Sequence, residues 1–333
     1  RREISEAGSL TLWLQRKGDA YRKGHSTPAQ AQAASAGHPL STELVDIIRR
    51  GVHLEMPPSF VPNGGVAGAL APQYLANKSR VHHGLGGDVE AGRAVIIPWD
   101  EVPPLDRALI HVSKVTWAPK AGRHIGRICM NLTSGSRRLP SLNHSIDMAR
   151  SHRRYPKPPA SDIRDVADAM MLKKALYPNT ELALAQCDVS GAYTTMSMDT
   201  DSCKLQTVFL DLELTPDDPV TRCLVFVLTN IFGNKIAGDA YGVAATIFKD
   251  TYDSCRGVGP MGSAMYVDDH TLIEPAHEIQ GCLDFAASLP VSILGERSID
   301  RSGGKVVVMG TRGDVIGFTC DLTEGTIGPK RRS

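Results

Sequence analysis

The stretch Met265-Tyr266-Val267-Asp268-Asp269-His270 decides the fold, within the run Gly262-Ser-Ala-Met-Tyr-Val-Asp-Asp-His-Thr-Leu-Ile273. Apolar residues flank a polar centre, which predicts a strand, a tight turn and a second strand, with two adjacent carboxylates at the tip. Neighbouring residues of a strand point to opposite faces, so a turn is where both acids can reach one site. Two like charges side by side are unfavourable unless a cation neutralises them, and a hard ion such as Mg²⁺ takes oxygen ligands. A solvated turn with favourable Asx chemistry is the alternative interpretation.

Length and composition indicate an ordinary globular chain. The 333 residues suffice for one large domain or two to three smaller ones, and 42% hydrophobic residues support a core. No apolar run is long enough to span a bilayer, so we expect no membrane partner. The chain starts with Arg1-Arg2 and has no signal-peptide pattern, which suggests a fragment of something longer. Seven scattered cysteines without a Cys-x-x-Cys pair fit a reducing compartment, so we expect an intracellular location, cytoplasmic or nuclear.

Charge is unevenly distributed along the chain. Residues 108–158 contain ten Lys and Arg against one acid, Asp147, so this segment carries +9 while the whole chain carries +1. A basic block beside an acidic remainder favours a polyanionic partner held near a cation-binding centre. A solvated basic face is the alternative explanation.

A second acidic motif precedes the first by about eighty residues. Leu182 to Asp188 is an apolar, alternating strand that ends in Asp188, and Gly191 lets the backbone turn closely past a ligand. Amphipathic periodicity predicts helices over 161–176, 238–252 and 278–289. The order of strands and helices indicates an α+β fold, with a split β-α-β antiparallel sheet and helices on one face. Residues 1–38 are expected to be weakly ordered, and Pro57–Gly87 extended or looped.

The acidic motifs resemble those of reverse transcriptases. Asp188-Val-Ser-Gly-Ala-Tyr193 resembles the family's Asp-x-x-x-Ala-Tyr/Phe, and Tyr266-Val-Asp-Asp269 is a common form of its Tyr-x-Asp-Asp box. Other segments between about Arg93 and Pro329 agree in order and spacing: Pro119-Lys120, Gly126-Arg127, Ser141-Leu-Asn143, Asn230-Ile-Phe-Gly233, Lys305 and Ile316-Gly-Phe318. Ser141-Leu-Asn143 looks more like the retrotransposon enzymes, with the DIRS-like class as the candidate, than like the vertebrate retroviral ones.

The resemblance implies a right-hand polymerase with palm and fingers, in which the thumb is absent. Residues 1–92 would form an N-terminal extension that is partly disordered, and 93–180 the fingers. Residues 181–333 would form the palm and end at the primer-grip hairpin, with about 194–230 able to return to the fingers.

The resemblance also implies an RNA-directed DNA polymerase that adds dNTPs to a primer 3′-OH on an RNA or DNA template by two-metal phosphoryl transfer. Asp188, Asp268 and Asp269 would be catalytic and, with the Val189 carbonyl, would hold two Mg²⁺ ions, for which Mn²⁺ can substitute. Tyr193 would lie under the sugar and reject a 2′-OH. The nucleotide-binding residues implied are Lys120, Arg127, Ala192, Tyr193, Phe232, Gly233 and Lys305, and the primer grip is Ile316, Gly317 and Phe318.

Some positions depart from the family pattern. Asn131 stands where many relatives have an acid, Ile231-Phe232 replaces Leu-Pro, and Ile316 replaces a Phe. Two other functions stay open. An RNA-dependent RNA polymerase would keep the fold but usually carries a smaller or polar group in place of Tyr193. An inactive element remnant would bind nucleic acid without polymerising it.

Overall fold

The computed structural model describes residues 2–65, 72–119, 126–133, 135, 141–157, 161–213, 220–300 and 305–330. Contacts divide the chain into two compact units, each assembled from separated stretches. Unit 1 comprises Arg1–Gly24, Ile47–Arg154 and Met196–Ala237, and unit 2 comprises His25–Asp46, Tyr155–Thr195 and Gly238–Ser333. Helices and mostly antiparallel sheets occur together, which confirms the α+β class.

Unit 1 is organised around a five-stranded sheet with the order β1-β6-β5-β2-β3. Its only parallel pair in the described ranges is β2 with β5, which brings Val112 opposite Thr207. Asp211 on β5 lies opposite Arg222 on β6, and the two side chains form an ion pair of 2.7 Å. The strands are β1 (Ala94–Pro98), β2 (Val112–Pro119), β3 (Gly126–Asn131), β5 (Thr207–Leu212) and β6 (Thr221–Val227), and the helices are α1 (Arg2–Ala7), α2 (Leu10–Arg22), α5 (Pro72–Ala76), α6 (Lys78–Glu90), α7 (Pro104–Arg107), α8 (Leu142–Ser145), α9 (Met148–Arg154) and α11 (Thr200–Leu205).

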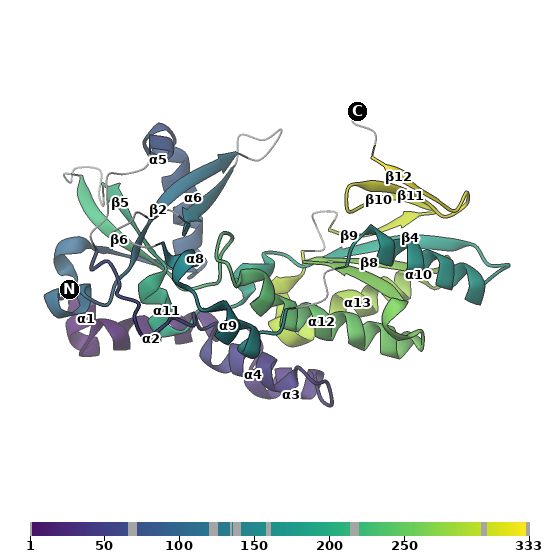
Figure 1. Ribbon diagram of the computed structural model, residues 1–333, viewed down its shortest axis with the longest axis horizontal. Helices are drawn as coiled ribbons and strands as arrows, with labels where there is room; N and C mark the ends of the chain where they lie inside the picture. Colours follow the sequence, from purple (N-terminus) through teal and green to yellow (C-terminus); the bar gives the residue numbers. More distant parts are fainter. Residues whose placement is uncertain are drawn as a thin grey trace. The chain divides into compact units, whose positions relative to one another are not determined.

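Unit 2 contains a four-stranded sheet with the order β7-β8-β4-β9 and a three-stranded sheet with the order β10-β11-β12. Helix α13 contacts β4, β8 and β9, and the three-stranded sheet lies on the other side of these strands (Figure 1). The strands are β4 (Leu182–Asp188), β7 (Ser263–Tyr266), β8 (Asp269–Pro275), β9 (Val306–Gly310), β10 (Arg312–Val315), β11 (Phe318–Asp321) and β12 (Thr326–Pro329), and the helices are α3 (Pro28–Ala34), α10 (Ile163–Leu176), α12 (Ala237–Arg256) and α13 (Ile279–Leu294). Helix α4 (Ser41–Arg50) runs across the division between the units, and α12 begins at the last residue of unit 1.

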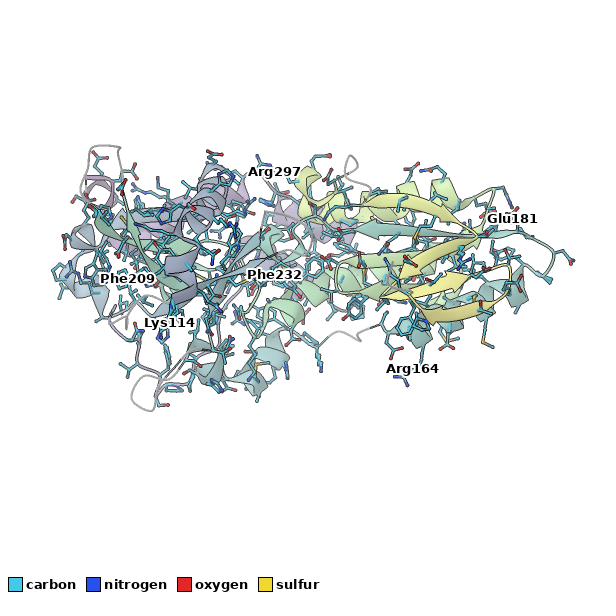
Figure 2. The ribbon with its side chains drawn as sticks, turned by 90° about the horizontal axis from the view of Figure 1, so that it is seen from above. Lys114, Arg164, Glu181, Phe209, Phe232 and Arg297 are labelled. Atoms are coloured by element: carbon cyan, nitrogen blue, oxygen red, sulfur yellow. The ribbon has the colours of Figure 1, made fainter. Side chains whose placement is uncertain are left out.

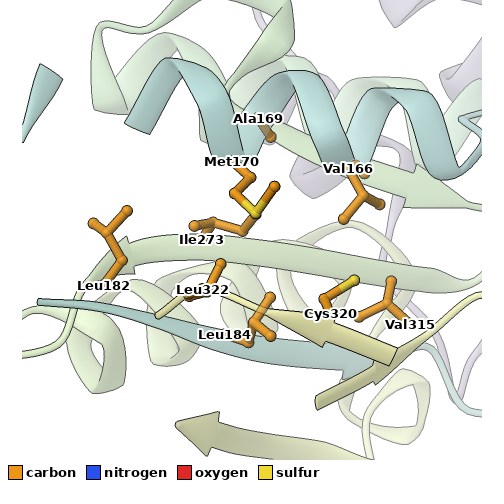
Figure 3. Packing of buried hydrophobic residues seen from close by; sticks show 10 residues of the cluster. Val166, Ala169, Met170, Leu182, Leu184, Ile273, Val315, Cys320 and Leu322 are labelled. Carbon is orange, nitrogen blue, oxygen red and sulfur yellow. The ribbon is translucent and has the colours of Figure 1, made fainter. Parts of the chain in front are cut away.

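An apolar core joins helix α10 to both sheets of unit 2 (Figure 3). Val166, Ala169 and Met170 follow the i, i+3, i+4 spacing of one helix face, as the sequence predicts. They pack with Leu184 and Ile273, which lie directly opposite each other on β4 and β8. The three-stranded sheet adds Val315 and Cys320, and Leu322 joins them from the turn directly after β11. This packing explains why α10 belongs to unit 2 and not with the strands that precede it. The division between the units therefore lies before α10, whereas the expected boundary between fingers and palm was residue 180.

The expectation of weak order over residues 1–38 is wrong. Helix α2 has Ser9 as its N-cap, and it buries Leu10, Trp13 and Leu14. Helix α3 starts with a reciprocal capping box between Thr27 and Gln30. The small, polar residues of 26–37 do not show the apolar period of a helix. The first turn of α3 is stabilised by its cap and not by an apolar stripe, so the sequence pattern did not predict it.

The expectation of an extended or looped segment over 57–87 is also wrong for its last part. Helices α5 and α6 occupy Pro72–Ala76 and Lys78–Glu90. Val81 and Leu85, four residues apart, are buried, so tertiary packing overrides the low helix propensity of the glycines at 84, 86 and 87. Within the described ranges, none of the helices combines the length and the apolar content that crossing a bilayer requires.

A buried charged cluster connects α10, β8 and α12 inside unit 2. Lys173 Nζ lies 2.6 Å from Glu274 Oε1, and both side chains have no exposed surface. The Tyr252 hydroxyl donates to the same carboxylate at 2.9 Å. Arg256 pairs with Glu274 at 3.1 Å and with Glu278 at 2.6 Å. The Glu274 charge is thus surrounded by donors, as a buried carboxylate requires.

Candidate active site

The tip of the β7–β8 hairpin has the geometry that the sequence predicts. Tyr266 pairs with Asp269, so the turn consists of Val267 and Asp268. Val267 has φ = 57°, and Asp268 does not have a positive φ. A positive φ at the first turn residue alone is the type II′ pattern, which normally has glycine there. A β-branched residue in this conformation is strained by roughly 1–3 kcal/mol, so the surrounding structure must hold the tip in place.

The end of strand β4 lies against this tip. Asp188 is directly opposite Asp269 in the antiparallel ladder. The Val189 amide donates to the Asp268 carbonyl at 3.0 Å, and the Asp188 amide donates to the Lys305 carbonyl at 2.8 Å. The three acids predicted to act together therefore meet at one end of the sheet, although eighty residues separate Asp188 from the other two. Like charges in directly opposed positions destabilise a sheet.

Electrostatics at this end of the sheet reflect an excess of negative charge. The pKa of Asp269 is raised to about 6, first by burial and then by the charges of Asp188 and Asp268. Lys305 opposes that shift, and its Nζ lies 2.5 Å from Asp188 Oδ2. Lys305 thus neutralises part of the charge of the three carboxylates, but the pKa of Asp269 remains raised.

The donor set here consists of oxygen atoms, which suits a hard divalent cation. Burial, and then the charges of Asp188 and Asp268, raise the pKa of Asp269, and a bound cation would favour its ionised form. Throughout the described residues, however, no three His, Cys, Asp or Glu side chains are gathered into a metal-binding group as they stand. The Asp188 carboxylate holds the Lys305 ammonium instead, so a cation would have to compete with it.

The segment after Asp188 turns sharply and carries the predicted nucleotide-binding residues Ala192 and Tyr193. Gly191 has φ = 61°, and a Cβ there would lie 2.8 Å from Thr194 Oγ1, so a larger residue would be strained at this turn. Ala192 is buried in the short 3₁₀ turn Ala192–Thr195. The Tyr193 ring packs edge-on against Tyr241, with 6.0 Å between the ring centroids. Burial, and then the charge of Asp268, raise the pKa of Tyr193. The Tyr193 hydroxyl is therefore close enough to the tip of the β7–β8 hairpin to be affected by its charge.

A hydrogen-bond chain that the sequence did not suggest anchors the hairpin from behind. The Ser263 hydroxyl donates to Asp253 Oδ1 at 2.7 Å and accepts from His270 Nε2 at 2.8 Å. Lys249 Nζ donates to Asp253 Oδ2 at 2.6 Å. Burial lowers the pKa of His270 to about 3, so the ring is neutral. The chain ties both hairpin strands to helix α12, and the sequence signal for it was the polar His270 directly after the two acids.

The residues expected to form a primer grip, Ile316, Gly317 and Phe318, lie at the turn of the β10–β11 hairpin in unit 2, with Phe318 as the first residue of β11. Val315 pairs with Phe318, so the turn consists of Ile316 and Gly317, which have φ values of 51° and 79°. Two positive φ values in a two-residue turn are the type I′ pattern. Ile316 is strained there, and its side chain packs against the core around α10, which offsets the strain. The sequence suggests one last hairpin between strands over 314–320 and 325–327; the structure instead splits the first of these at Ile316-Gly317 and forms three strands, β10, β11 and β12.

Phe232 and Gly233 lie in unit 1, in a loop that the sequence linked to the nucleotide pocket. Phe232 is 43% exposed (Figure 2). Gly233 has φ = 95°, and a Cβ there would lie 3.0 Å from the Met130 carbonyl. Asn143 holds this loop with its amide, which donates to the Gly233 carbonyl at 2.6 Å and accepts from the Lys235 amide at 3.0 Å. Asn143 belongs to the segment Ser141-Leu-Asn143, but nothing in the neighbouring sequence indicated that its side chain holds the loop over 231–235.

The two basic residues predicted to bind the triphosphate cannot be placed in the same way. Lys120 lies outside the described residues. Of Arg127 only the backbone is described, and it pairs with Ala118 in the β2–β3 hairpin. Lys114, at the base of that hairpin, is exposed (Figure 2).

Comparisons with known proteins find a similarity to a solved structure and no match to a family model or a curated protein. A solved structure, described as that of the foamy viral protease-reverse transcriptase in complex with RNA/DNA hybrid, is similar with a TM-score of 0.46 and 13% sequence identity. The similarity covers 95% of this chain and 36% of that one, so the chain spans about a third of the solved protein's length. Because the TM-score is below 0.5, we base the function on the geometry of the site.

Proposed function

We propose that this chain is a nucleotidyltransferase that extends a primer on a nucleic-acid template, and that it is an RNA-directed DNA polymerase. The observation that carries the proposal is the direct opposition of Asp188 and Asp269, with the Asp268 carbonyl accepting from the Val189 amide just after β4. Carboxylates from distant segments are brought to one end of a sheet, where burial and like charge raise the pKa of Asp269. Such an arrangement is expected where a cation is part of the working site.

Asp188, Asp268 and Asp269, with the Val189 carbonyl, would hold two Mg²⁺ ions. When bound, the ions would favour the deprotonated primer 3′-OH and neutralise charge on the triphosphate. The chain's own residues supply positioning. The hydrogen-bond chain through Ser263 and His270 holds the hairpin on α12, and the pairing of β4 with β8 fixes where the acids meet. Positioning and charge stabilisation would carry the rate.

Tyr193 would select the sugar of the nucleotide. Its ring is held by the edge-on contact with Tyr241, and its pKa responds to the charge of Asp268, so it lies beside the proposed reaction centre. A rigid aromatic ring under the sugar leaves no room for a 2′-OH, which favours dNTPs over rNTPs. This argues for a DNA polymerase and against an RNA polymerase.

The basic segment over 108–158 would bind phosphates of the template and primer without sequence preference. Binding should therefore weaken steeply as salt is raised. The roles of Lys120, Arg127, Phe232 and Gly233 at the nucleotide, and of Ile316, Gly317 and Phe318 at the primer end, are part of the same proposal. So is the origin of the chain in a retrotransposon of the DIRS-like class.

Primer extension tests the proposal. Asp268→Asn should lower Mg²⁺-dependent dNTP addition on a primed RNA by more than about 100-fold, because losing a direct ligand exceeds the 10–100-fold effect of second-shell changes. Asp284→Asn, an exposed position on α13, is the matched control and should retain activity. Unchanged incorporation by Asp268→Asn would overturn the assignment of the site. Equal use of rNTPs and dNTPs would favour an RNA polymerase instead.

One observation favours a second function, which is nucleic-acid binding without polymerisation. The Lys305 ammonium already pairs with the Asp188 carboxylate at 2.5 Å, which is the position a divalent ion would need. A permanently bound lysine would leave a protein whose basic segment holds nucleic acid without extending a primer on it. A positive gel shift with no primer extension at any Mg²⁺ or Mn²⁺ concentration would select this function.

A further inference from the structure

The face of the β4–β8 pair that carries Asp188 changes character along its length. Neighbouring residues of a strand alternate between faces, so every second pair of the ladder lies on the same face. From the core towards the tip, these pairs are Leu184 with Ile273, Gln186 with Thr271, and Asp188 with Asp269. The first pair belongs to the apolar core on α10 (Figure 3), and the last consists of proposed metal ligands. A polar pair therefore separates the core from the acids.

Apolar packing does not explain this polar pair. Thr271 is 2% exposed, and its hydroxyl has no hydrogen-bond partner among the described residues. A buried hydroxyl without a partner destabilises a fold, and valine, which has nearly the same shape, would extend the core of Leu184 and Ile273 without that cost. Gln186, directly opposite Thr271, is half-buried and is also polar. The side chain of Gln186 must therefore be explained by what its amide contacts.

Gln186 reaches the Asp269 carboxylate diagonally across the two strands. Because the pair of Asp188 with Asp269 is the next one on this face, Gln186 and Asp269 are diagonal neighbours. Residues in such positions lie about 7–8 Å apart, which a long side chain can span. The Gln186 side chain indeed hydrogen-bonds to Asp269. An ionised carboxylate only accepts hydrogen bonds, so the amide of Gln186 is the donor.

This donor differs from Lys305 in its charge. The Lys305 ammonium pairs with Asp188 at 2.5 Å and would compete there with a cation. The amide of Gln186 is neutral, so it can hold the Asp269 carboxylate without repelling a divalent ion. An ionised carboxylate has two oxygen atoms with about four acceptor positions, so one donor leaves positions open for a metal–oxygen bond. Gln186 can therefore hold Asp269 both before and after a cation binds.

We infer that Gln186 is a positioning residue, which fixes the orientation of the Asp269 carboxylate for a divalent cation. Gln186 has this role only if Asp269 is a metal ligand, so the assignment rests on the proposed function. Gln186 itself contacts neither the cation nor the nucleotide. Replacing a side chain that hydrogen-bonds to a metal ligand typically lowers metal affinity or activity by about 10–100-fold. A glutamine that only satisfied a half-buried carboxylate would affect stability and leave metal affinity unchanged.

Binding of Mn²⁺ alone tests this role. The free ion gives an electron paramagnetic resonance signal that is lost on binding, so a titration measures affinity without a polymerase assay. Gln186→Met removes the amide at nearly constant side-chain length and should weaken Mn²⁺ binding by roughly 10-fold. Thr271→Val, the matched control, removes the unpartnered hydroxyl directly opposite on the same face and should bind Mn²⁺ like the wild type. Asp269→Asn, which loses a proposed ligand, should weaken binding at least as much as Gln186→Met.

The outcomes separate the role of Gln186 from the proposed function. If Asp269→Asn weakens Mn²⁺ binding and Gln186→Met does not, Gln186 is not a positioning residue, while the metal site stands. If Thr271→Val weakens binding as much as Gln186→Met, the effect comes from packing of the polar pair, and the role of Gln186 is overturned. If the wild type binds no Mn²⁺, or Asp269→Asn binds it as tightly as the wild type, the proposed metal site is overturned together with the role of Gln186.

A second measurement decides if Gln186→Met does not fold, which circular dichroism would show. The side-chain NH₂ group of Gln186 is followed by nitrogen-15 NMR in the wild type and in Asp269→Ala. Its resonances should shift when Mg²⁺ is added to the wild type. Its protons should exchange with water faster in Asp269→Ala than in the wild type, because the hydrogen-bond acceptor is gone. The absence of either response would overturn the role of Gln186.

Discussion

Replacing Asp269 by Asn should make the metal-free protein more stable while removing its proposed activity. Asp269 has its pKa raised from 3.8 to about 6 by burial and by Asp188 and Asp268. That difference corresponds to about 3 kcal/mol against the ionised form in the folded chain, and partial exposure reduces it to roughly 1–2 kcal/mol. Asn has the same shape, carries no charge and can still hydrogen-bond. At pH 7.5 the variant should therefore gain roughly 1–2 kcal/mol in free energy of unfolding.

The pH dependence distinguishes this cause from others. Between pH 3.8 and about 6 the folded wild type binds more protons at Asp269 than the unfolded chain, so its stability falls as pH rises through this window. The advantage of Asp269→Asn should be complete above pH 6 and disappear towards pH 4. Urea unfolding followed by circular dichroism at pH 4.5, 6 and 7.5 measures it, with Asp284→Asn as the control. A variant that is less stable than wild type at pH 7.5, or whose gain is the same at every pH, would refute the reasoning.

Three further predictions follow from other contacts. Lys173→Met should lower the free energy of unfolding by about 3 kcal/mol, because it leaves the Glu274 charge buried without its partner. The double variant Lys173→Met with Glu274→Leu should restore most of that loss. Urea titrations in which the effects of the two single variants simply add up in the double variant would contradict this. Asn143→Ala removes the side-chain hydrogen bonds that hold the loop over 231–235, so its amides should exchange faster in hydrogen-exchange measurements, and unchanged exchange would show that the loop is held otherwise. Lys305→Met removes the positive charge that lowers the pKa of Asp269, so a carbon-13 NMR titration of that carboxyl should give a midpoint above that of the wild type; a lower midpoint would show that the lysine acts differently.

The local elements around the site could be predicted from the sequence because their signals are local. Apolar residues on both sides of two acids define the β7–β8 hairpin, and the alternating run before Asp188 defines β4. The helical period over 161–176 likewise matches α10 apart from its first two residues. The N-terminal helices were missed because capping, and burial of side chains by distant segments, decide them.

Other features depend on contacts between distant segments, which no local pattern contains. The register that puts Asp188 opposite Asp269 arises from sheet pairing, and the ion pair between Asp188 and Lys305 links residues more than a hundred positions apart. The hydrogen-bond chain through Ser263, His270 and Asp253 joins residues that are close in sequence, and His270 was its signal, but the packing of α12 on the hairpin decides which side chains meet.

The sequence by itself determined which residue types could carry the chemistry: two acidic motifs, an aromatic residue after the first, and a basic block. Only the tertiary structure decided their environment, including the raised pKa of Asp269, the lysine on Asp188 and the hydrogen-bond chain behind the hairpin. The physical reason is that charge compensation and desolvation depend on which groups lie within a few ångströms in space, and chain folding sets those neighbours.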